Sequence, residues 1–79
     1  MFKEGIKVMQ DFLDSTPGGN NEIRRLARLS LGDYYRSIGW YNSAKKEYDV
    51  LVRHYYPDYT EGKLAYKAIA EMKKEGKIK

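Results

Sequence analysis

Apolar side chains recur along the chain at spacings of three and four residues, the period of an α-helix with one buried face. Four such stripes are formed by Phe2, Gly5, Ile6, Met9, Phe12 and Leu13; by Ile23, Ala27, Leu31, Tyr34, Tyr35 and Ile38; by Ala44, Tyr48, Leu51, Val52 and Tyr55; and by Leu64, Ala65, Ala68, Ile69 and Met72. No stretch shows the strict alternation of apolar and polar positions that is typical of a half-buried strand. The pattern therefore predicts an all-α protein whose helices cover about residues 2–14, 21–38, 41–56 and 59–75.

Helix-breaking residues separate these stripes. Proline and glycine at positions 17–19 follow the first stripe, Gly39 follows the second, and Pro57 follows the third. Such short connections make consecutive helices antiparallel neighbours. The sequence thus predicts a single domain over residues 1–79, built from four antiparallel helices as stacked helical hairpins.

The predicted helices repeat in pairs. A shift of 38 residues places Leu26 on Leu64 and Asp33 on Glu71, and a shift of 39 places the first stripe on the third. Self-similarity at a fixed period is typical of proteins that stack one supersecondary unit on the next.

The centre of the chain carries a set of residues at fixed offsets. They are Leu31, Gly32, Tyr35, Gly39, Tyr41, Ala44, Tyr48 and Pro57. The set resembles the tetratricopeptide repeat (TPR), whose pattern runs L-G-x-x-Y, G-x-Y, A-x-x-x-F or Y, and P. The period of 38 to 39 residues is similar to the longer variety found in bacterial envelope-assembly TPR proteins. In such a fragment of an α-solenoid, Gly32 and Ala44 are expected where two helices cross closely, with Tyr35 and Tyr48 beside the crossing.

The resemblance implies a non-catalytic scaffold that binds a partner protein or peptide on its concave side, which the first helix of each repeat lines. By matched register, the lining residues are Leu26, Leu29, Asp33, Arg36 and Ser37 from one helix and Leu64, Lys67, Glu71, Lys74 and Glu75 from another. Leu26 and Leu29 would provide apolar anchors. Arg36, Lys67 and Lys74 would attract an acidic peptide or a chain-terminal carboxylate.

Two interpretations stay open for the apolar members of this set. Leu26 and Leu64 could instead pack between helices. Trp40 follows the turn at Gly39, where an exposed tryptophan would be an interface anchor. It could equally cover the end of the hairpin by packing on Tyr41 or a neighbouring loop.

The net charge of +4 comes entirely from the end of the chain, because positive and negative side chains balance over residues 1–61. Residues 62–79 hold six lysines and two glutamates. A charge run of this kind is usually a solvated helix face. The alternative is a basic nucleic-acid-binding domain whose aromatic side chains stack on bases. Against nucleic acid, Tyr35, Tyr41 and Tyr48 are expected to be buried.

Catalytic and metal-binding patterns are missing from the sequence. The chain has no cysteine, and its only histidine, His54, has no neighbouring cluster of ligands. The serines lack a base at a pairing distance in sequence. The sequence therefore predicts no enzyme activity, no cofactor and no metal site.

The chain is short for a repeat array, since such arrays need about three units and this one holds one complete repeat and two halves. Apolar edges at Phe2, Ile6, Ile78 and part of the last helix are therefore expected to be exposed. Self-association through the terminal helices, or excision from a longer array, would cover them. No apolar run approaches the length of a membrane span. A cytoplasmic location is expected, or a periplasmic one if the chain belongs to a longer exported protein.

Overall fold

The computed structural model describes residues 7, 11 and 22–79, and within them it contains three helices and no strand. These are α2 (Glu22–Ser37), α3 (Tyr41–Tyr55) and α4 (Thr60–Lys74). The all-α class is confirmed, and these helices agree with the predicted ranges to one residue at each end.

The prediction of four antiparallel helices is wrong, because the structure has three in its described part. Of the helix predicted over about residues 2–14, only residues 7 and 11 are among the described residues, and the rest lies outside them. A periodic stripe shows only that a helix would be amphipathic, and a helix of about 12 to 15 residues depends on packing for its stability. The apolar pattern over residues 2–14 is therefore not sufficient evidence for a fourth helix.

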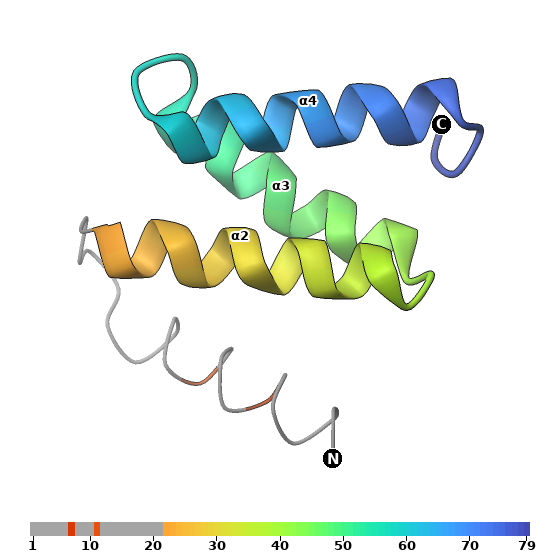
Figure 1. Ribbon diagram of the computed structural model, residues 1–79, viewed down its shortest axis with the longest axis horizontal. Coiled ribbons are helices and arrows are strands. Elements are labelled where there is room, and N and C mark those ends of the chain that lie inside the picture. Colours follow the sequence, from red (N-terminus) through yellow and green to blue (C-terminus); the bar gives the residue numbers. More distant parts are fainter. Residues whose placement is uncertain (1–6, 8–10, 12–21) are drawn as a thin grey trace.

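The three helices form two successive hairpins that share α3 (Figure 1). α2 and α4 run in the same direction and α3 runs back between them, with extensive contacts to both. α2 and α4 also contact each other directly, although much less. None of the helices in this part of the chain has the length and apolar character required to cross a membrane.

The core lies where α3 meets its two neighbours. Its buried apolar residues are Leu31, Tyr35, Ala44, Tyr48, Leu51, Ala65, Ala68, Met72 and Ile78. The predicted close crossing of α2 and α3 is confirmed, because a Cβ atom on Gly32 would lie 2.7 Å from Cε1 of Tyr48. Ala44 and Tyr48 are fully buried, and Tyr35 is 4% exposed.

A second close crossing joins the beginning of α4 to the end of α3. A Cβ atom on Gly62 would lie 2.5 Å from the carbonyl carbon of Tyr55 and 2.6 Å from the backbone nitrogen of Tyr56. Backbone atoms cannot turn aside as the end of a side chain can, so this position requires a glycine.

The turn between α2 and α3 is a Schellman motif, in which a residue with positive φ ends a helix. Gly39 has a φ of 84° and its N–H donates to the carbonyl oxygen of Arg36, while the N–H of Trp40 donates to that of Tyr35. The rings of Trp40 and Tyr35 are stacked with centroids 5.8 Å apart. Trp40 therefore supplies the apolar contact that accompanies this motif.

The same motif ends α4 and turns the chain back. Gly76 has a φ of 76°, and the N–H of Lys77 donates to the carbonyl oxygen of Met72. Ile78 then lies in the core at 9% exposure, and Nζ of Lys77 lies 5.4 Å from the centre of the Tyr41 ring. The prediction that Ile78 forms an exposed edge is wrong, because the turn at Gly76 directs it inward. Phe2 and Ile6 lie outside the described residues.

Candidate interaction groove

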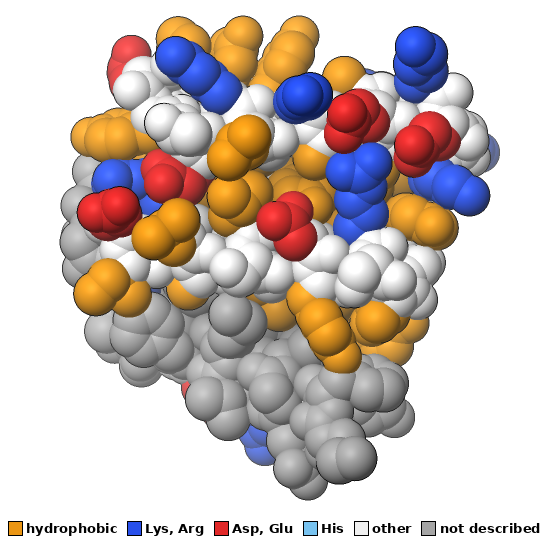
Figure 2. Space-filling model, in the orientation of Figure 1, with side chains coloured by type: hydrophobic (Ala, Val, Ile, Leu, Met, Phe, Trp, Pro, Cys, Tyr) orange, Lys and Arg blue, Asp and Glu red, His pale blue; other side chains and the backbone are white. Residues whose placement is uncertain are grey.

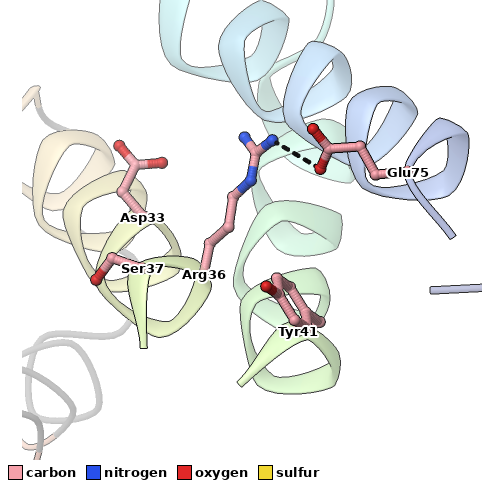
Figure 3. A pocket seen from close by; sticks show the side chains of 5 residues that line it. All are labelled: Asp33, Arg36, Ser37, Tyr41 and Glu75. Atoms are coloured by element: carbon pink, nitrogen blue, oxygen red, sulfur yellow. Dashed lines mark ion pairs between the residues drawn. The ribbon is translucent and has the colours of Figure 1, made fainter. Parts of the chain in front are cut away.

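The groove between α2 and α4, which we call the α2–α4 groove, is lined by the helices that the repeat pattern assigns to the concave side. Figure 2 looks onto this groove and shows hydrophobic side chains within it and charged side chains across it. At one end it widens to a pocket of about 390 Å³, lined by Asp33, Arg36, Ser37, Tyr41 and Glu75 (Figure 3).

Arg36 crosses the groove from α2 to the end of α4. Its Nη1 lies 3.4 Å from Oε1 of Glu71, and its Nη2 lies 3.6 Å from Oε1 of Glu75. Burial alone would lower the pKa of this guanidinium, but the hydrogen bond and charge of Glu71, together with the charge of Glu75, raise it. Arg36 is therefore a fixed cation that two carboxylates already neutralise.

Asp33 lies on the other side of Arg36 from Glu75 (Figure 3). Its Oδ1 accepts a hydrogen bond of 2.5 Å from the hydroxyl of Tyr48, a buried residue of α3. Burial, and after it the hydrogen bond to Asp33, raise the pKa of Tyr48 well above its ordinary value. Asp33 itself is exposed, so it joins the core to the groove surface.

A second ion pair links α2 to α4 at the opposite end of the groove. Nε of Arg25 donates to Oε1 of Glu61 over 3.0 Å, and both side chains are nearly buried, at 13% and 11% exposure. The guanidinium also lies over the ring of Tyr59, 4.2 Å from its centre. The sequence pattern did not assign Arg25 or Glu61 to the site, because they lie on different helices 36 positions apart and helical spacing relates only residues of the same helix.

The apolar residues predicted for the groove differ in exposure. Leu26 is 45% exposed and Leu64 is 47% exposed, whereas Leu29 is half-buried against the core. Leu26 follows Arg25 directly and Leu64 lies one turn after Glu61, so the ion pair between those two residues brings the leucines to the same end of the groove. Both leucines therefore offer apolar surface to solvent.

The remaining predicted site residues lie at the edges. Lys67 and Lys74 are exposed on α4, and the structure records no ion pair between either of them and another described residue. Trp40 is 42% exposed at the end of the hairpin, where its ring lies on Tyr35 instead of on Tyr41. It belongs to the turn and is not among the residues that line the groove pocket.

The exposed tyrosines pair with other aromatic rings. Tyr56 and Tyr66 are stacked with centroids 4.7 Å apart and an interplanar angle of 17°. Tyr59 lies edge-on to Tyr55 at 5.6 Å. A base could therefore reach at most one face of either ring in the Tyr56–Tyr66 stack.

The described residues include no group of three histidine, aspartate or glutamate side chains that could hold a metal ion. His54 is exposed near the end of α3, and its ring is tilted against that of Tyr55 with centroids 6.1 Å apart.

Comparison of the chain with models of protein families, with curated proteins and with solved structures finds no match.

Proposed function

We propose that the protein is a non-catalytic interaction module of the TPR type, which holds a segment of a partner protein in the α2–α4 groove. The observation that carries the proposal is the pair of leucines at repeat-equivalent positions. Leu26 and Leu64 are both nearly half exposed, and each lies within a turn of a member of the Arg25–Glu61 ion pair that joins α2 to α4. Large apolar side chains exposed together are typical of surfaces that bind another protein.

The ion pairs support this role because they hold the groove at a fixed width. Arg25 with Glu61 and Arg36 with Glu71 tie α2 to α4 at both ends. A groove that is already formed loses less entropy when a partner binds than one that must first be ordered.

The charges of the groove argue for apolar anchors over recognition of a carboxylate. An acidic segment would have to displace Glu71 and Glu75 from Arg36, and Asp33 would repel it. Lys67 and Lys74 remain as exposed cations on α4 that could guide a partner during its approach.

The proposal is tested by immobilising the chain, retaining proteins from a lysate and identifying them by mass spectrometry. A specific partner is expected to bind the unaltered chain and to be lost when the groove is altered by Leu26→Glu or Leu64→Glu. Tyr66→Glu is the matched control, because it places the same charge on an exposed residue of α4 that lines a different depression, between α3 and α4.

Circular dichroism of each variant checks that the helices persist. Retention of the same proteins by the unaltered chain and by both groove variants would contradict the proposal.

A further inference from the structure

A second apolar surface lies on the side where α3 and α4 pack together, and we call it the outer α3–α4 face. It consists of Val52 from α3, Tyr56 directly after the end of α3, and Tyr66, Ile69 and Ala70 from α4. Tyr56 is 43% exposed and Tyr66 is 53% exposed. Figure 2 shows a row of hydrophobic side chains along the upper edge of the molecule, over α4.

This face is hollowed and mostly apolar, with charge at its rim. A depression of about 360 Å³ is lined by Asp49, Val52, Tyr66, Ile69, Ala70 and Lys73. Asp49 belongs to α3 and Lys73 to α4. Because the two helices are antiparallel, these charges share one end of the face, and the stacked Tyr56 and Tyr66 share the other.

We propose that a second copy of this chain covers the outer α3–α4 face in a two-fold symmetric dimer. With the symmetry axis along the face and parallel to the helices, α3 of each copy lies over α4 of the other. Asp49 of each copy then meets Lys73 of the second copy, and the tyrosine stacks meet at the opposite end. The arrangement is an antiparallel four-helix packing, which is a common way to bury two apolar helix faces.

The charges select a second copy over an unrelated helix. A two-fold interface brings the same patch of both subunits together, so each residue must suit its symmetry-related neighbour. Asp49 on α3 and Lys73 on α4 lie at the same end of the face, so the two-fold axis creates two identical contacts between an acid and a base. Asp49 now pairs with Lys45 at 2.8 Å within α3, and because more than a third of each side chain is exposed, this pair contributes little and can be exchanged.

Sedimentation equilibrium of the full 79-residue chain, up to about 1 mM so that weak association is detected, measures the dimer directly. The apparent mass is expected to rise from 9.3 kDa towards twice that value with concentration. Tyr66→Glu and Ile69→Glu are expected to keep the chain monomeric.

Leu64→Glu is the matched control, because it alters an equally exposed residue of α4 that does not line this depression. It is expected to leave the dimer intact although it should abolish capture of a partner. Dimerisation lost by Leu64→Glu and kept by Tyr66→Glu would overturn the inference, as would a monomer at every concentration. Neither result would touch the proposed function of the groove.

A charge exchange keeps the test valid if the apolar variants unfold. Asp49→Lys alone and Lys73→Asp alone are each expected to weaken dimerisation about tenfold, because like charges then meet across the axis. An equimolar mixture of the two variants is expected to restore it, since a mixed dimer pairs lysines only with aspartates. A mixture that associates no better than its components would rule out this arrangement.

Discussion

At the scale of single residues, two glycines determine how closely the helices approach each other. Gly32 allows the ring of Tyr48 to lie against α2, and Gly62 allows α4 to begin against the backbone of Tyr55 and Tyr56. The repeat pattern predicted the first of these glycines. It did not predict the second, because a glycine near the start of a helix carries no distinguishing signal in the sequence.

The two glycines should differ in how they tolerate alanine. The obstacle is a side chain at Gly32 and a backbone at Gly62, so the second site has less freedom to adjust. Alanine regains up to about 1 kcal/mol of helix propensity at either site. We expect net losses in the free energy of unfolding of about 1 kcal/mol for Gly32→Ala and about 2 kcal/mol for Gly62→Ala.

Urea unfolding measures both values. Ser30→Ala, at an exposed position within α2, serves as the control and should change stability by less than about 0.5 kcal/mol. A smaller loss at Gly62 than at Gly32 would contradict the close backbone contact.

The hydroxyl of Tyr48 should make stability depend on alkaline pH. Its pKa is raised in the folded state, so an unfolded chain releases this proton near pH 10 while the folded chain retains it. The resulting stabilisation is complete below about pH 10 and is lost as the pH rises further. Tyr48→Phe is expected to cost about 1.5 kcal/mol at neutral pH, through the lost hydrogen bond to Asp33.

Urea unfolding of both proteins between about pH 7 and 11 tests this expectation. The free energy of unfolding should fall less steeply above about pH 10 in Tyr48→Phe than in the unaltered chain, which contains the same seven other tyrosines. Parallel profiles would show that Tyr48 does not titrate differently on unfolding.

At the scale of the helices, the sequence located α2, α3 and α4 well because each ends at a residue of distinct backbone chemistry. Gly39 ends α2 with a positive φ, and Pro57 follows α3 closely. Ile78 escaped prediction because its burial depends on the direction the chain takes after Gly76. A periodic pattern carries no information about that direction.

The two links across the groove should differ in strength. Arg25 and Glu61 are nearly buried, whereas Arg36 pairs with glutamates that are about half exposed. Removing one member of a buried pair leaves an uncompensated charge, so we expect Glu61→Ala to cost about 3 kcal/mol. Glu71→Ala on the same helix should cost no more than about 1 kcal/mol.

Thermal and urea unfolding of the two variants make the comparison. Addition of salt should reduce only the contribution of Glu71, because buried pairs are screened much less than exposed ones. Equal losses in the free energy of unfolding for both substitutions would contradict this prediction. They would indicate that the Arg25–Glu61 pair stabilises the fold no more than an exposed ion pair does.

At the scale of the whole molecule, the sequence identified the helices that form the groove but not what joins them. Matched register assigned Leu26 and Leu64 to one surface, and both side chains are nearly half exposed. The ion pairs of Arg25 with Glu61 and of Arg36 with Glu71 could not be predicted. Their members are 36 and 35 positions apart in the sequence and meet only because α3 places α2 beside α4. Helical spacing defines a face of one helix, but not its distance from the next.

The distribution of charge predicts weak interaction with nucleic acid. The excess lysines are spread along α4 and the tail, while Tyr56 and Tyr66 stack on each other. A single-stranded oligonucleotide should therefore show no salt-sensitive binding by fluorescence anisotropy at physiological ionic strength. Affinity that falls with salt and with neutralisation of Lys67, Lys73, Lys74 and Lys77 would favour the basic nucleic-acid-binding domain instead.

The stacking of Trp40 on Tyr35 gives the molecule a built-in optical reporter. Trp40 is the only tryptophan, and it lies at the turn that closes the first hairpin. Excited tyrosines transfer energy efficiently to an indole ring at such short range, so light absorbed by tyrosine should emerge as tryptophan emission while the turn is closed. Opening of the turn between α2 and α3 would then be visible in unlabelled protein as a loss of this sensitised emission.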